Sequence, residues 1–126
     1  MFNYHGQRTI LCIDDDDGML CYQKALFERR GYRGYKVLTA ASARQGLRIA
    51  AVCEVTAVVV DYHMPEMNGL EFAIEVKRLK PQMPIVMFSS DDAIPESALN
   101  VVDAFVSKNE VPRCLLPGRS SRYPRW

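Results

Sequence analysis

The residue best placed for chemistry in this sequence is Asp61, which directly follows the apolar run VVV at residues 58–60. A continuous apolar run is typical of a strand buried on both faces of a sheet. The chain then breaks into a loop that contains Pro65 and Gly69. Asp61 is therefore expected where a central strand leaves the core, and the rest of the chain is expected to supply its carboxylate with neighbours.

Other polar residues close apolar segments in the same way: Asp14 and Asp15, Ser89, and Lys108. In an open parallel sheet, ligands bind at the carboxyl ends of the strands, where the strand order reverses. If the strands that carry Asp14 and Asp61 are neighbours, three carboxylates converge, and their mutual repulsion favours a bound cation. The natural occupant is Mg²⁺, held by one or two carboxylates together with water.

Carboxylates, a metal ion, a hydroxyl and a lysine around Asp61 make a site for a phosphoryl group. The metal and Lys108 would neutralise charge on the phosphoryl oxygens while Asp61 attacks phosphorus and becomes an aspartyl phosphate. Taken singly, each feature has a simpler explanation: residues 14–17 suit a solvated turn with a helix cap, Ser89 a turn, and Lys108 a surface charge. The prediction depends on four strand ends that each carry the residue type this chemistry needs.

The elements that must position these residues alternate between strands and helices. Apolar segments predict strands at residues 9–13, 37–40, 57–60, 85–88 and 104–107. Apolar residues at three- and four-residue spacing predict helices at 19–30, 43–50, 69–79 and 95–102. Asp17 and Ser42 are expected to cap the first two of these helices. The alternation predicts an α/β fold, doubly wound, with a five-stranded parallel sheet covered on both faces.

Length and charge limit the classes of protein to consider. The chain of 126 residues suffices for one domain with a core, and its net charge of +1 predicts neither nucleic acid nor a membrane surface as a partner. No apolar run approaches the roughly 20 residues that cross a membrane. We expect a polar lead-in at 1–8, one domain at 9–110, and at 111–126 a short irregular basic tail with four Arg and no acid.

The cysteines are scattered along the chain: Cys12, Cys21, Cys53 and Cys114. None forms a C-x-x-C pair or has a companion His at the spacing of a zinc site. Cys12 and Cys21 lie in apolar patterns, which predicts buried free thiols in a reducing compartment. The expected location is the cytoplasm.

Four segments together resemble the receiver domain of response regulators in two-component signalling. The segments are ILCIDD at 10–15, VVVDYHMPEMNG at 58–69, PIVMFSS at 84–90 and AFVSK at 104–108. They occur in the family's order with compatible spacing, and the resemblance covers roughly residues 8 to 110. It implies a flavodoxin-like sheet in the order 2-1-3-4-5 and a signalling switch that promotes only its own phosphorylation and dephosphorylation.

The resemblance also implies a role for each candidate residue. Asp61 would be the phosphoacceptor, and Mg²⁺ would be held by Asp14, Asp15, Asp61 and the backbone carbonyl of His63. Ser89 and Lys108 would contact the phosphoryl group, and Phe105 would be the aromatic switch residue. His63 and Asp91 occupy the variable positions that tune the lifetime of the phosphoryl group.

The implied partners are proteins. A sensor histidine kinase or a phosphotransfer protein would donate the phosphoryl group, and a downstream protein would receive the signal. The resemblance also allows a homodimer, and it implies no contact of this domain with nucleic acid or membrane.

Two positions depart from the family's pattern. Asn109 follows Lys108, where the family usually has Pro, often with a cis bond. A cis bond before a residue other than proline costs about 2.5–4 kcal/mol, so a trans bond and a differently aimed Lys108 are expected. Pro112 and Pro117 also restrict any fifth helix to a turn or so, which predicts a truncated or irregular fifth helix.

Two other functions fit part of the sequence. The segment DDDGM at 15–19 resembles the D-x-D-G-T nucleophile loop of haloacid dehalogenase-type phosphatases, with Met19 in place of Thr. A small phosphatase of that type would become phosphorylated on Asp15, whereas a receiver uses Asp61. The other alternative is a receiver-like interaction module that works without phosphorylation.

Overall fold

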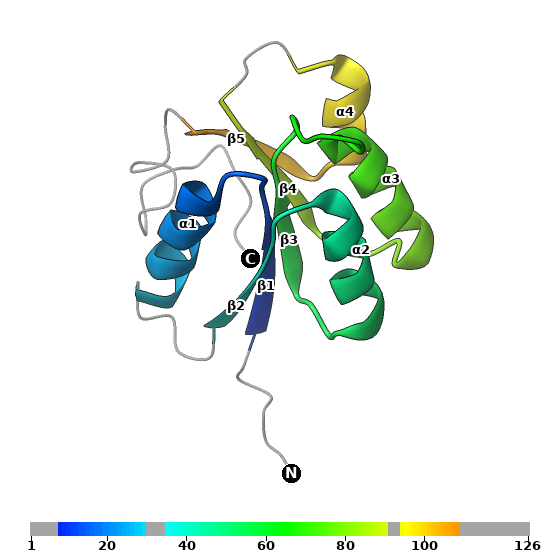
Figure 1. Cartoon of the computed structure of the whole chain (residues 1–126). Helices are drawn as coiled ribbons and strands as arrows, with labels where there is room; N and C mark the ends of the chain where they lie inside the picture. Colours follow the sequence, from blue (N-terminus) through cyan, green and yellow to red (C-terminus); the bar gives the residue numbers. More distant parts are fainter. Residues whose placement is uncertain (1–7, 30–34, 91–93, 109–126) are drawn as a thin grey trace.

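The computed structural model describes residues 8–29, 35–90 and 94–108. Within these residues, five strands alternate with four helices, as Figure 1 shows. The strands are β1 (Arg8–Ile13), β2 (Tyr35–Ala40), β3 (Ala57–Val60), β4 (Ile85–Ser89) and β5 (Ala104–Ser107). The helices are α1 (Asp17–Arg29), α2 (Ala43–Val52), α3 (Gly69–Leu79) and α4 (Glu96–Val101).

The strands form one parallel sheet in the order β2-β1-β3-β4-β5, which confirms the predicted topology. The order reverses between β1 and β3, because β2 lies on one side of β1 and β3 to β5 follow on the other. The register pairs Ile13 with Val60 and Ser89 with Ser107. The carboxyl ends of neighbouring strands therefore meet at one edge of the sheet.

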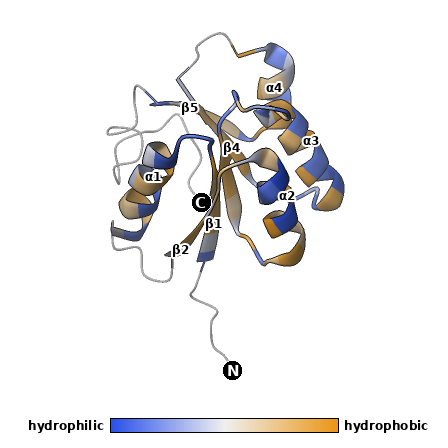
Figure 2. Ribbon diagram, viewed as in Figure 1, coloured by the Kyte–Doolittle hydropathy of each residue, from blue (hydrophilic) through white to orange (hydrophobic). Residues whose placement is uncertain are grey.

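Helices cover both faces of the sheet (Figure 1). Helices α2, α3 and α4 lie on one face over the larger apolar cluster, in which Leu11, Val58 and Phe72 are fully buried. Helix α1 lies on the other face, over the smaller cluster that includes Cys12 and Leu20. Cys12 is buried as predicted, but the prediction for Cys21 was wrong: its side chain is exposed on α1, next in sequence to the buried Leu20. Figure 2 shows that the apolar residues concentrate on the strands and on the inner sides of the helices. Every residue of β3 and β4 is buried, as expected for continuous apolar runs in strands covered on both faces.

Local side-chain caps fix where α1 and α2 begin. Ser42 accepts a hydrogen bond from the Gln45 N–H and caps α2, as predicted. The prediction for α1 was wrong by one residue: the Asp16 carboxylate accepts from the N–H groups of Gly18 and Met19, at 2.9 and 3.2 Å, so Asp16 is the cap and Asp17 opens the helix. Sequence pattern alone cannot choose among four consecutive aspartates, because each one offers the same acceptor.

Each element begins and ends within two residues of its predicted bounds. Strand β3, strand β5 and helix α3 have the predicted bounds, while β2 begins two residues earlier, at Tyr35. Helix α4 is as short as its sequence suggests, with six residues. Several predictions lie outside the described residues: the lead-in before Arg8, Asp91, Asn109, Cys114 and the tail at 111–126.

Candidate functional site

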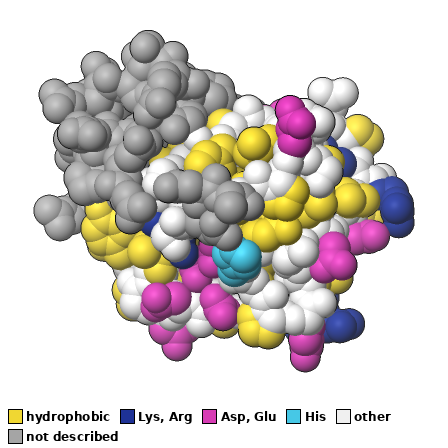
Figure 3. All heavy atoms as spheres, turned by 90° about the horizontal axis from the view of Figure 1, so that it is seen from above, with side chains coloured by type: hydrophobic (Ala, Val, Ile, Leu, Met, Phe, Trp, Pro, Cys, Tyr) yellow, Lys and Arg dark blue, Asp and Glu magenta, His cyan; other side chains and the backbone are white. Residues whose placement is uncertain are grey.

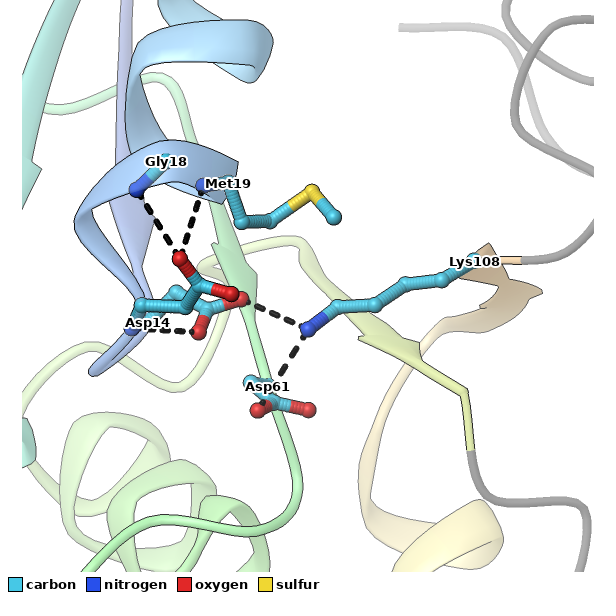
Figure 4. A network of polar contacts seen from close by, with 6 residues as sticks. Asp14, Gly18, Met19, Asp61 and Lys108 are labelled. Atoms are coloured by element: carbon cyan, nitrogen blue, oxygen red, sulfur yellow. Dashed lines mark hydrogen bonds and ion pairs between the residues drawn. The ribbon is translucent and has the colours of Figure 1, made fainter.

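Three charged side chains from three strand ends meet at the carboxyl edge of the sheet (Figure 4). Asp14 follows β1, Asp61 follows β3 and Lys108 follows β5. The Lys108 Nζ lies 2.8 Å from Asp14 Oδ2 and 3.5 Å from Asp61 Oδ2. Both carboxylates are buried, at 1% and 7% exposure. The ammonium group is therefore an internal counter-ion for two acids that the chain could not otherwise bury.

The turn after β1 aims the Asp14 carboxylate. Its Oδ1 accepts a hydrogen bond from the Asp16 N–H at 3.0 Å, while its Oδ2 accepts from Lys108. The Asp14 N–H donates to the Ala40 carbonyl on the neighbouring strand at 3.1 Å. Because Asp16 in turn caps α1, the start of this helix and the orientation of Asp14 are fixed by one connected set of bonds.

Three carboxylates at this edge could hold a metal ion. Asp14, Asp15 and Asp61 each offer one oxygen, and these oxygens all lie within 4.8 Å of one another. Asp15 is exposed and the other two are buried. Oxygen ligands with an open side toward water suit Mg²⁺, which keeps several of its water ligands. The donor set therefore fits the predicted ion.

The pKa values of the two central groups follow from their surroundings. Burial raises the pKa of the Asp61 carboxyl, the Lys108 ammonium opposes this rise, and the Asp14 carboxylate adds to it. Burial by itself lowers the pKa of Lys108, but its contacts with Asp14 and Asp61 outweigh burial and leave that pKa raised. Lys108 thus keeps its charge, whereas ionised Asp61 is less stable than an exposed carboxylate.

Gly69 lets the loop after Asp61 close against the strand end. Its N–H donates to the Tyr62 carbonyl at 2.8 Å. A Cβ at this position would lie 2.6 Å from the Asp61 carbonyl oxygen and 2.9 Å from Tyr62 Cα. The sequence marked Gly69 only as a loop residue and helix start; its close approach to the Asp61 backbone was missed. The pair Asn68-Gly69 is the signal that could have indicated a tight backbone approach.

The remaining predicted residues surround this centre. Ser89 is buried at the end of β4, directly beside Ser107 of β5 in the register, and Phe105 packs partly buried against the larger apolar cluster. His63 is exposed, and its ring contacts the Tyr62 ring edge-on with centroids 4.8 Å apart. Figure 3 shows the molecule from above, and acidic side chains are grouped on this face. Ser107, a buried hydroxyl at a strand end, was not singled out from the sequence.

Comparison with known proteins agrees with this geometry. The sequence profile of the response regulator receiver domain matches residues 10–115. The transcriptional regulatory protein GlrR of Escherichia coli K12 is 34% identical over 93 residues, which are 74% of this chain and 20% of GlrR. The chain also spans only 44% and 46% of two further curated relatives.

Solved structures show the same fold. A CheY-like receiver domain protein from Methanospirillum hungatei superposes with a TM-score of 0.73 at 27% identity, covering 86% of this chain and 94% of that one. Response regulator protein TrrA from Thermotoga maritima, solved in complex with Mg(2+)-BeF, has a TM-score of 0.75 at 22% identity, covering 87% of this chain and all of TrrA. The likeness to TrrA, at 22% identity, concerns the fold alone.

The chain therefore belongs to the response regulator receiver domain family of two-component signalling. Receiver domains are signalling switches. The match to the receiver-domain profile does not favour the two alternatives, the haloacid dehalogenase-type phosphatase and the phosphorylation-independent module. No helix in the described part of the chain is long and apolar enough to cross a membrane.

Proposed function

We propose that Asp61 of this receiver domain accepts a phosphoryl group from a phosphohistidine of a sensor histidine kinase or a phosphotransfer protein. The observation that carries the proposal is the placement of the Lys108 ammonium between the buried carboxylates of Asp14 and Asp61, with Asp15 within reach of the same point. This arrangement places one fixed positive charge beside a nucleophilic oxygen at the end of a central strand.

In the transfer step, an Asp61 carboxylate oxygen forms a bond to phosphorus while the bond from phosphorus to the histidine nitrogen breaks. The nitrogen keeps the electron pair of the broken bond. Lys108 would pair with the phosphoryl oxygens and so stabilise charge in the transition state. Mg²⁺, held by Asp14, Asp15, Asp61 and the His63 carbonyl, would supply further neutralisation of those oxygens.

The signal would leave the site through Ser89 and Phe105. Ser89 would move to bond a phosphoryl oxygen, and Phe105, which is only partly buried, would turn inward as the domain shifts between two packings. His63 and Asp91 would tune the lifetime of the phosphoryl group from the mouth of the site. The receiving partner would be a downstream protein or a second copy of the domain.

We further propose that the domain acts in the cytoplasm and only on its own phosphorylation state. The free thiols in the described part of the chain, Cys12, Cys21 and Cys53, support a reducing compartment. In the release step, a water oxygen would form a bond to phosphorus while the bond from phosphorus to the Asp61 oxygen breaks and the carboxylate keeps the electron pair. The domain would then act on no substrate other than its own aspartyl phosphate.

Phosphorylation by a small donor tests the proposal. Incubation with acetyl phosphate and Mg²⁺ should add one phosphoryl group to the intact protein, seen by mass spectrometry and as an acyl phosphate signal in ³¹P NMR. Asp61→Asn should abolish the adduct, whereas Asp15→Asn should slow its formation by weakening metal binding. If the adduct formed equally in Asp61→Asn and was lost in Asp15→Asn, the phosphatase hypothesis would replace this one.

A further inference from the structure

Strand β2 forms one edge of the sheet, because in the described part of the chain only β1 pairs with it. Ala40 faces inward, since its carbonyl accepts a hydrogen bond from the Asp14 N–H that follows β1. Successive residues of a strand turn their backbone groups to opposite sides, so Tyr35, Val37 and Thr39 face outward. An open edge of this kind is a template on which another strand can pair.

Two side chains of α1 occupy the central residue of this edge. Helix α1 runs beside β2 (Figure 1), and the Glu28 carboxylate accepts a hydrogen bond from the Val37 N–H at 3.2 Å. The Lys24 ammonium lies 2.8 Å from Glu28 Oε2 and reaches the Val37 carbonyl with a longer bond of 3.5 Å. Both outward backbone groups of Val37 are thus bound by side chains of their own chain.

The stability of α1 by itself does not account for this pair. Glu28 is the penultimate residue of α1, where a negative charge meets the negative end of the helix dipole. A Lys four residues before a Glu is also the weaker order for a pair on a helix surface. Both side chains are half-exposed, so their mutual attraction contributes little. The contacts with Val37 distinguish this pair from an ordinary surface ion pair.

A second copy of the domain is the partner that fits this edge. The outward residues Tyr35 and Thr39 lie symmetrically about Val37 along the strand. In an antiparallel pair, two opposite residues can exchange both of their backbone hydrogen bonds, and a twofold interface uses the same surface on both copies. A twofold axis beside Val37 would therefore set it opposite Val37 of a second copy, donor to acceptor in both directions.

We propose that Lys24 and Glu28 form a clamp that keeps the outer edge of β2 closed to β2 of a second copy of this chain. While the clamp is closed, a second strand can pair only by displacing both side chains from the middle of the edge. Once it is open, the two Val37 residues can exchange two hydrogen bonds across the axis. The proposal does not depend on the chemistry of Asp61.

Glu28→Ala opens the clamp and keeps α1, since alanine is the best helix former. Dimerisation in analytical ultracentrifugation should tighten at least tenfold relative to the wild type. A factor of ten corresponds to about 1.4 kcal/mol, the size of one to two net backbone hydrogen bonds. Amide hydrogen exchange locates the contact: the Val37 N–H should be protected in the wild type at every concentration, and in Glu28→Ala only where the variant is dimeric.

Two control variants isolate the cause. Glu75→Ala removes another ion pair on a helix surface, the one with Arg78 within α3, on the other face of the sheet. It should leave self-association unchanged. Glu28→Gln removes the charge and keeps a side-chain oxygen that can accept from the Val37 N–H, so it should stay closer to the wild type than Glu28→Ala does.

Three results would overturn the proposal. The first is equal self-association of Glu28→Ala and the wild type. The second is a Val37 N–H that exchanges freely in the wild type or in the dimer of Glu28→Ala, because the clamp or the contact would then lie elsewhere. The third is an equal gain in Glu75→Ala, which would assign the effect to surface charge. If circular dichroism showed that Glu28→Ala does not fold, Lys24→Ala would test the clamp from the carbonyl side, with the same gain in dimerisation expected.

Discussion

Gly69→Ala should damage both the fold and the site, because the new methyl group meets backbone atoms. The Cβ would lie 2.6 Å from the Asp61 carbonyl oxygen, whereas real Cβ contacts essentially never fall below 3.0 Å. The backbone must therefore open by at least 0.4 Å, the difference between these two distances. It can do so only by moving α3 or by moving the end of β3 that carries Asp61.

The magnitude follows from the kind of contact. Overpacking of this sort costs about 1–3 kcal/mol. For a domain of this size, 1 kcal/mol corresponds to a fall in melting temperature of about 4 °C, so a loss of about 4–12 °C is expected. A displacement of a few tenths of an ångström at the nucleophile should also slow phosphorylation by acetyl phosphate at least several-fold.

Gly46→Ala is a matched control for this substitution. Its Cβ would come as close, 2.5 Å from Ile13 Cδ1 and 2.9 Å from Ile13 Cγ1, but it would meet side-chain atoms and no backbone atom, so the strand itself need not move. Alanine also favours the interior of α2 by about 1 kcal/mol. We expect a smaller change in melting temperature, measured by circular dichroism, and an unchanged phosphorylation rate. If Gly69→Ala had the melting temperature of the wild type and was phosphorylated at the wild-type rate, the claim that Gly69 positions Asp61 would be refuted.

Three further predictions concern other parts of the structure. Because the pKa of Asp61 is raised, the folded state binds its proton more tightly than the unfolded state, so this group destabilises the fold as pH rises through the raised pKa. Asp61→Asn should therefore raise the melting temperature at pH 7, and the gain should shrink as pH falls toward 4; a gain that grew at low pH would contradict the sign. Burial raises the pKa of the Cys12 thiol to about 12, so iodoacetamide at pH 8 should label exposed Cys21 and spare Cys12, as peptide mass spectrometry can show. The Asp103 carboxylate accepts a hydrogen bond from the Ile85 N–H at 2.8 Å and pairs with Lys77 at 2.9 Å. Asp103→Ala should therefore lower the free energy of unfolding, measured with urea, by about 1–2 kcal/mol. An unchanged free energy of unfolding would show that water replaces both bonds.

Much of the fold could be predicted because its signals are local. The run at residues 58–60 indicates a strand buried on both faces, and all four of β3's residues are buried. Strand ends that carry Asp14, Asp61 and Lys108 could be expected at one edge, because parallel strands joined by helices all finish on the same side of the sheet. The cap at Ser42 could be predicted for the same reason, since its side chain bonds only to a residue three positions away.

Tertiary structure decided what depends on distances across the fold. Lys108 and Asp14 are 94 positions apart, and their 2.8 Å contact follows from strand register and the path of the backbone. The same is true of Gly69, whose missing side chain matters only because the Asp61 backbone passes within reach. Sequence alone determined which groups gather at the edge of the sheet, since residue type and strand ends are local properties. The folded chain decided which atoms touch, since a shift of a few tenths of an ångström separates a contact from a clash.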